Sequence, residues 1–331
     1  MRTPRRLAAL AAAAFALAFA PAALAAGTVG TSFPAGFPTI VDHSLGVPVI
    51  GFGAAGPVTR TPVVFLHGNN DTPFPTACNP YGAIHGLAQS PVDAGYAPSE
   101  VWGLGYQGDQ CDLFADQTHR SGEAHSTVAN VPDLRAFVHA VLDYTGARQV
   151  DIVGHSLGVT LVRAWLREDH ASRLVRRLVA IDGPNHGIIS CSPNPLNYWQ
   201  LPALGGFTPD SAICREYGAA DTPFLQWLNR GSETPGPTRY LVLRNADTDF
   251  VYMPTRDGFF AGVPAEDRNG APHDFSQSAR LDGAETVSLT GQGAFDPILG
   301  TTHLGILASP ATAALVLDFL TRPLPGPQTV H

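Results

Sequence analysis

The chain has 331 residues, a formal net charge of −8 and only 15% charged side chains, against about 25% in an average soluble domain. All 20 basic residues are arginines, which excludes mechanisms built on a Schiff-base, pyridoxal-phosphate or phosphate-loop lysine. The acidic balance also argues against nucleic acid as a partner, because such binding depends on cationic patches.

The first 25 residues are typical of a secretory signal peptide. Three arginines precede an apolar run over 7–20, and Ala23-Leu24-Ala25 fits a cleavage site. A membrane anchor is the alternative, since the apolar stretch with its tail reaches about 20 residues. Secretion would leave a domain over 26–331 in which 17 arginines face 28 acidic residues, a net charge of −11. We expect an extracellular protein without a stable membrane anchor.

The four cysteines form an even set, as expected in an oxidising compartment. We predict that neighbours along the chain pair, Cys78 with Cys111 and Cys191 with Cys214. By closing a loop, each bond would stabilise the folded protein by about 3 kcal/mol on a chain-entropy estimate. The spacings are not those of a zinc site, and we predict no metal.

Strands and helices are expected to alternate along the chain. A short strand near 47–50 is followed by apolar runs that predict strands. These runs are 62–66, 101–106, 149–153, 178–181, 240–243 and 285–289. Apolar residues at helical spacing predict helices over 131–145, 159–167 and 310–321. The alternation predicts one α/β domain, with a mostly parallel sheet flanked by helices on both faces.

One stretch, about 183–238, interrupts the alternation. It is rich in proline, glycine and aromatic residues, and a connection this long inside a domain is usually functional. We interpret it as a lid-like insertion and expect Trp199, Phe207 and Trp227 to contact substrate. The alternative is extra helices that only pack on the sheet.

Gly154-His155-Ser156-Leu157-Gly158 is a G-x-S-x-G pentapeptide between a predicted strand and a predicted helix. This context predicts a nucleophilic serine on a tight strand-to-helix turn, with small residues allowing strand and helix to pass closely. The helix N-terminus favours negative charge developing near the serine hydroxyl. The alternative, a serine that only caps the helix, does not require both glycines.

A serine hydroxyl needs a base, and the base needs a carboxylate to orient it. In the chain order Ser, acid, His, His303 fits the base because it falls in the loop between the last strand and the last helix. Asp247 and Asp249 both follow the penultimate strand, and Asp182 follows the strand before it. Spacing alone does not decide which of these three aspartates orients the base.

Two backbone N–H groups are needed to bind an oxyanion. One belongs to Leu157, directly after the serine, and the other to the loop after the early strand. That loop begins His67-Gly68-Asn69, so Asn69 is the expected second donor.

With these motifs the chain resembles the lipase-like α/β-hydrolases. HGN, GHSLG and TDFVYMP look like the oxyanion loop, nucleophile turn and acid loop of that family, and ARLDGAETVSLTG with THLGIL is similar to the last strand and histidine segment of small secreted microbial lipases. The family's T-D-x-x-x-x-P pattern favours Asp249 over Asp247. A narrower resemblance, in FLHGNND and YTGARQVDIVGHSLGV, is to a lipase-like extracellular polyhydroxybutyrate depolymerase.

The resemblance implies an α/β-hydrolase fold and hydrolysis of carboxylic esters with apolar acyl groups, without a cofactor. A secreted polyester depolymerase is the alternative with the same chemistry. A binding protein on a hydrolase scaffold and a peroxide-dependent activity of the same three residues are more distant alternatives.

Overall fold

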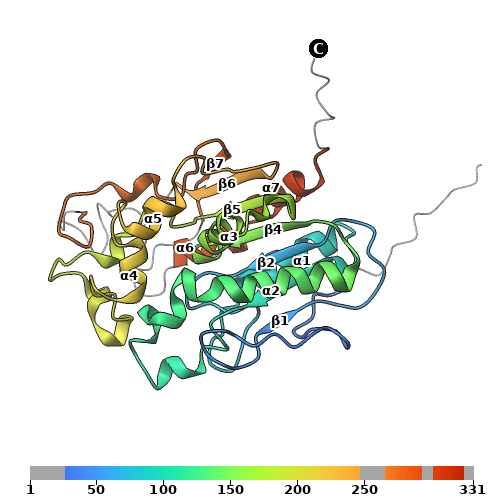
Figure 1. Ribbon diagram of the computed structural model, residues 1–331, viewed down its shortest axis with the longest axis horizontal. Helices are drawn as coiled ribbons and strands as arrows, with labels where there is room; N and C mark the ends of the chain where they lie inside the picture. The colour runs from blue at the N-terminus through green and yellow to red at the C-terminus, as the bar shows by residue number, and fades with distance from the viewer. Residues whose placement is uncertain (1–26, 247–264, 293–300, 324–331) are drawn as a thin grey trace, which may run out of the picture.

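A computed structural model describes residues 27–246, 265–292 and 301–323 of the chain (Figure 1). The expected signal peptide and both Asp247 and Asp249 lie outside these ranges.

One seven-stranded sheet forms the centre of the molecule, in the order β1-β3-β2-β4-β5-β6-β7, and Figure 1 shows it running from β7 at the top to β1 at the bottom. Only β1 is antiparallel to its neighbour; every other pair is parallel. The strands are β1 (Ile50–Phe52), β2 (Val63–Leu66), β3 (Val101–Gly105), β4 (Val150–His155), β5 (Val175–Ile181), β6 (Arg239–Asn245) and β7 (Glu285–Leu289). The predicted α/β class with a mostly parallel sheet is confirmed.

The apolar strands are explained by burial on both faces of the sheet. All four residues of β2 are buried, and successive side chains point to opposite faces. Val64 and Leu66 join a core with α2 and α3, whereas Val63 and Phe65 join a core with α1, α6 and α7. A strand covered on both faces needs a continuous apolar run rather than an alternating pattern.

Helices cover both faces of this sheet. The α-helices are α1 (Ala83–Asp93), α2 (Thr127–Thr145), α3 (Leu157–Glu168), α4 (Ala212–Tyr217), α5 (Pro223–Leu228), α6 (Thr301–Ala308) and α7 (Pro310–Thr321). Short 3-10 helices are η1 (Pro98–Glu100), η2 (Cys111–Phe114), η3 (His119–Ser121), η4 (Glu123–His125), η5 (Ala171–Arg173), η6 (Ile189–Cys191), η7 (Tyr198–Gln200), η8 (Pro202–Leu204) and η9 (Phe275–Gln277).

Some predicted boundaries were wrong for identifiable reasons. The first strand lies at Ile50–Phe52 rather than 47–50, and the helix predicted from 131 begins at Thr127. The Ser126 side chain caps that helix by accepting a hydrogen bond from the Ala129 N–H at 3.1 Å. Helix α1 was not predicted because Gly86 and Pro91 interrupt its apolar pattern.

The insertion over 183–238 carries η6, η7, η8, α4 and α5, and it follows the carboxyl end of β5. Figure 1 shows α4 and α5 at one end of the molecule, at left. Buried Ile213, Tyr217 and Leu225 of the insertion belong to the same core as α3. These helices therefore pack on the α/β domain.

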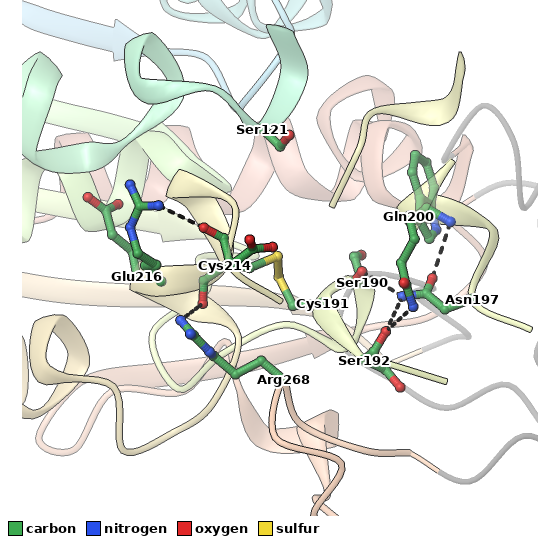
Figure 2. The surroundings of a disulfide bond; sticks show 12 residues. Ser121, Ser190, Cys191, Ser192, Asn197, Gln200, Cys214, Glu216 and Arg268 are labelled. Atoms are coloured by element: carbon green, nitrogen blue, oxygen red, sulfur yellow. Dashed lines mark hydrogen bonds between the residues drawn. A yellow bond between two sulfur atoms is a disulfide. The ribbon is translucent and has the colours of Figure 1, made fainter. Parts of the chain in front are cut away.

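Both predicted disulfides are present, Cys78–Cys111 with 4.9 Å between Cα atoms and Cys191–Cys214 with 5.5 Å. Figure 2 shows the second bond joining the segment before η7 to α4. Next to it, the Arg268 guanidinium donates to the Cys214 carbonyl oxygen at 3.0 Å. The disulfide therefore closes the insertion on itself.

No single helix in the described ranges is long and apolar enough to cross a membrane. Thr302–Ala308 and Pro310–Thr321 reach the required length and hydropathy only as a pair, and the chain bends by 57° between them.

Candidate active site

Ser156 lies on the turn between β4 and α3, at the carboxyl edge of the sheet. Its backbone has φ 51° and ψ −124°, a conformation that costs a non-glycine residue about 1–3 kcal/mol. The turn is held because the Ser156 N–H donates to the Ile181 carbonyl of β5 at 2.8 Å. Flanked by buried His155 and buried Leu157, the serine side chain itself is half-buried.

The two glycines of the pentapeptide allow close approaches in different directions. A Cβ on Gly154 would lie 3.1 Å from backbone atoms of Gly158 and Val159, so this glycine lets β4 pass close to α3. A Cβ on Gly158 would lie 2.6 Å from the His67 carbonyl oxygen. The second glycine therefore brings the helix against the end of β2 rather than against its own strand.

The loop after β2 packs directly on the serine. A Cβ on Gly68 would lie 2.8 Å from Ser156 Cβ and 3.4 Å from Ser156 Oγ, so only glycine fits at this position. The loop then turns, with the Asp71 N–H donating to the Gly68 carbonyl at 3.3 Å. Asn70, with φ 59°, takes the third position of that turn, where positive φ is required and asparagine is tolerated.

The two backbone N–H groups predicted to bind an oxyanion belong to residues next to the serine turn. Leu157 is the first residue of α3, and a first-turn N–H has no carbonyl partner within its own helix. Asn69 directly follows Gly68, the residue in contact with Ser156. Both amides are thus carried by segments that touch the serine.

His67, at the start of this loop, is a buried and neutral histidine. Its Nδ1 donates to the Gly68 carbonyl at 2.7 Å, and its ring stacks on Tyr106 with centroids 4.3 Å apart. Burial lowers the pKa of His67 to about 4. The ring therefore carries no charge at neutral pH and supports the loop.

His303 lies beside the serine turn through contact with His155. The His155 Nε2 hydrogen-bonds to the His303 carbonyl oxygen at 3.0 Å, and the two rings lie 4.6 Å apart. Burial first, and then the nearby His303, lower the pKa of His155 well below its usual value. Because a carbonyl oxygen only accepts, the neutral His155 carries its proton on Nε2.

The expectation that His303 lies in a loop was wrong, because it is the third residue of α6. The start of this helix is fixed to β6, since the Asn245 Nδ2 donates to the Thr302 carbonyl at 3.0 Å. Asp182, buried at the end of β5, accepts from the Asn245 N–H at 2.8 Å through Oδ1. These contacts place His303 at the carboxyl edge of the sheet, where β4, β5 and β6 end.

Asp71 is a buried carboxyl group at this site that sequence reasoning missed. Its Oδ1 accepts from the N–H groups of Thr72, at 2.8 Å, and Gly82, at 3.0 Å, while Oδ2 has no hydrogen-bond partner in the described part of the chain. Burial raises the pKa of Asp71 to about 6, and the nearby His303 opposes that shift. An acidic residue four positions after His67, in the loop that packs on the serine, was the available signal.

Comparison with known proteins identifies the family. The model of the family described as lipase (class 2) matches residues 60–256. The chain belongs to the family of class 2 lipases. As such it is a carboxylic-ester hydrolase, and the matched range includes β2, the serine turn and the insertion but not the helix that carries His303.

Solved structures with the same fold include two forms of a Bacillus licheniformis lipase, BlEst2. The mature form shares 18% identity with this class 2 lipase, with 80% of this chain and 96% of that chain covered and a TM-score of 0.50. The propeptide form gives 19% identity, coverage of 83% and 54%, and a TM-score of 0.50. Aspergillus fumigatus lipase B matches at 17% identity, coverage of 81% and 54%, and a TM-score of 0.46.

The three aromatic residues expected to contact substrate occupy different places in the lipase. Trp199 and Phe207 are buried, meet edge to face at 5.9 Å between ring centroids, and belong to the core. The Arg120 guanidinium lies 5.4 Å from the Trp199 ring. The Trp227 ring instead lies 5.6 Å from the Arg167 guanidinium. Arg167 is the penultimate residue of α3, so this contact is at the opposite end of the helix from Ser156.

In the described ranges, no three His, Cys, Asp or Glu side chains gather in a group that could hold a metal ion.

Proposed function

We propose that Ser156 is the nucleophile of this lipase, with His303 as its general base and Asp249 as the carboxylate that orients His303. The observation that carries the proposal is the packing at the serine turn. Ser156 has positive φ on a tight strand-to-helix turn, and the residue before it contacts His303. Because His155 directly precedes Ser156, its contact with His303 supports an imidazole acting on this serine, which the two required glycines flank.

Three aspartates are candidates for the carboxylate that orients His303. Asp249 fits the family pattern best, and Asp247 is the alternative two residues earlier. Both follow β6, whose last residue, Asn245, holds the start of α6. Asp182 is less suited to the role, because its carboxylate already accepts the Asn245 N–H.

In the proposed reaction, Ser156 Oγ attacks the ester carbonyl carbon while its proton passes to His303. The tetrahedral oxyanion is held by the N–H groups of Leu157 and Asn69, and one such donor is worth about 3–4 kcal/mol. Collapse breaks the bond to the alcohol oxygen, which takes the proton from His303. Water then attacks the acyl-enzyme and loses a proton to His303. Collapse breaks the bond between the acyl carbon and Ser156 Oγ, which takes that proton back from His303 as the acid is released. No step requires a cofactor.

We propose an ester with an apolar acyl group as the substrate, with secretion of the enzyme to reach it. The insertion supplies apolar surface, since Leu196 and Leu201 are 66% and 55% exposed. Trp199 packs against Phe207 and lies near Arg120, whose carbonyl oxygen accepts a hydrogen bond from the Asn69 side chain. Two disulfides support an oxidising compartment. The same exposed leucines also favour the second candidate, depolymerisation of a solid polyester.

The decisive experiment labels the enzyme with a fluorophosphonate probe and measures ester hydrolysis by wild type and Ser156→Ala. We expect labelling at Ser156 only, and a fall in kcat of about 10⁴–10⁶ in the variant with an unchanged melting temperature. Ser126→Ala serves as the control, because Ser126 caps α2 and is not at the turn. Substantial hydrolysis by Ser156→Ala, or no labelling of wild type, would overturn the assignment.

A substrate panel then separates the two candidates. We expect p-nitrophenyl esters of increasing chain length and triolein to be hydrolysed faster than a polyhydroxyalkanoate film. The opposite order would establish the depolymerase.

A further inference from the structure

Polar groups from the segment 107–125, two side chains and one backbone carbonyl, converge on the side chain of Asn69. The Asn69 Oδ1 accepts from Gln107 Nε2 at 3.2 Å and from His125 Nδ1 at 2.6 Å. The Asn69 Nδ2 donates to the Arg120 carbonyl at 3.0 Å. Three groups distant in sequence thus fix the orientation of a single amide group in the loop that packs on Ser156.

The next residue of the loop is held from two sides as well. The Asn70 N–H donates to Gln107 Oε1 at 3.2 Å, and the Asn79 Nδ2 donates to the Asn70 carbonyl at 2.8 Å. Gln107 therefore bonds Asn69 with its amide nitrogen and Asn70 with its amide oxygen. Since Asn70 has φ 59°, these bonds also stabilise a turn that the backbone would not favour by itself.

His125 is suited to act as a fixed donor. It is fully buried, and because Asn69 Oδ1 can only accept, the His125 proton must be on Nδ1. Burial, followed by the neighbouring His119, Arg120 and His67, lowers the pKa of His125 well below its usual value. The ring is therefore neutral at neutral pH, with its proton on Nδ1.

The Cys78–Cys111 disulfide joins the loop after β2 to the segment 107–125 that bonds it. Cys78 precedes Asn79, which bonds Asn70. Cys111 precedes Asp112, whose carboxylate lies 3.0 Å from His119 Nδ1. The His119 ring in turn meets the His125 ring edge to face at 4.2 Å.

We infer that His125 and Gln107 are positioning residues for catalysis, which hold the Asn69 backbone N–H where it can bind the oxyanion. The inference rests on the proposed function, in which that N–H is a donor. The hydrogen bonds of both side chains reach Asn69 and Asn70, so both residues act through the loop. An oxyanion donor is effective only when its placement is accurate to about 0.5 Å, and removing one donor costs about 10²–10³ in kcat.

The test compares His125→Asn with His125→Leu. Both variants lose the imidazole ring and have the same side-chain shape, but only asparagine offers an N–H close to the position of Nδ1. We expect His125→Leu to lower kcat about 10- to 100-fold with KM within about 2-fold, and His125→Asn to recover most of kcat. The affinity for a trifluoromethyl ketone, whose adduct with serine carries an oxyanion, should fall in parallel with kcat.

Asn197→Leu is the matched control. Asn197 is also buried, and its side chain bonds Ser190 and Ser192 carbonyls within the insertion. Its loss should lower the melting temperature and leave kcat and ketone affinity unchanged. If His125→Leu fails to fold, Gln107→Met replaces it, with the same expected fall in kcat.

Equal kcat and equal ketone affinity in His125→Leu and His125→Asn would overturn the inference, as would an unchanged kcat in Gln107→Met. Failure of the proposed function gives a different result, since the fluorophosphonate would then not label Ser156 in any of these proteins.

Discussion

The loop after β2 and the insertion after β5 both leave the carboxyl edge of the sheet. A disulfide ties the loop to the segment after β3, whereas the other disulfide closes the insertion on itself. They are held in different ways. Hydrogen bonds from Gln107 and His125 fix single atoms of the loop, whereas buried Trp199 and Tyr217 anchor the insertion in the core. Apolar burial supplies free energy without direction, while hydrogen bonds supply direction at a modest net free energy. We therefore expect changes in the loop to affect kcat, and changes in the insertion to affect stability and KM.

The largest expected effect on stability comes from Trp199→Ala. Removing this buried ring should lower the free energy of unfolding by about 3–5 kcal/mol, measured by urea denaturation. With active sites titrated by fluorophosphonate, kcat should stay within about 2-fold, while KM for long-chain esters should rise. A 10-fold fall in kcat per titrated site would show that the insertion, too, positions catalytic groups.

Removing each disulfide in turn tests the comparison directly. Cys78→Ser with Cys111→Ser opens a connection of 33 residues, and Cys191→Ser with Cys214→Ser one of 23. Both double variants should lose about 3–4 kcal/mol on the chain-entropy estimate. Only the first should also lower kcat, by about 10-fold at a temperature where both are folded, because only that bond ties the residues around Asn69 and Asn70. The reverse outcome, with kcat lowered by the second pair alone, would contradict the comparison.

A smaller effect is expected from two buried carboxyl groups, Asp71 in the loop and Glu216 in the insertion. Burial raises the pKa of Asp71 from 3.8 to about 6 and the pKa of Glu216 from 4.5 to about 7. Because the folded-state pKa lies above the unfolded one, each group makes folding less favourable as pH rises through this interval, by at most about 3 kcal/mol. The protonated forms carry no such penalty below about pH 4.

Asp71→Asn should therefore melt higher than wild type at pH 8, with the difference shrinking toward pH 4. Its amide oxygen can keep both backbone hydrogen bonds, since both reach Oδ1 of Asp71. Glu216→Gln should raise the melting temperature less. The two Glu216 oxygens accept from different N–H groups of α2, those of Thr127 and Val128, and a glutamine amide keeps only one of these oxygens. Melting temperatures at pH 5 and pH 8 measure this, and a difference from wild type that does not grow with pH would refute it.

What the sequence by itself determined is local along the chain. The serine turn spans five residues, so the glycines that permit it can be recognised from spacing alone. Burial on both faces of the sheet imposes continuous apolar runs, which located β2, β4, β6 and β7 to within a few residues. The disulfide pairing followed from an even set of cysteines that close short loops.

Only the tertiary structure decided which separate segments meet at the serine. His303 was assigned from chain order, but its position in α6 beside His155 depends on how β6 holds that helix through Asn245. The bonds that Gln107 and His125 make to Asn69 join positions 38 and 56 residues apart. No periodicity or short motif records such contacts, because a hydrogen bond across the fold depends on the packing of all the chain between its partners.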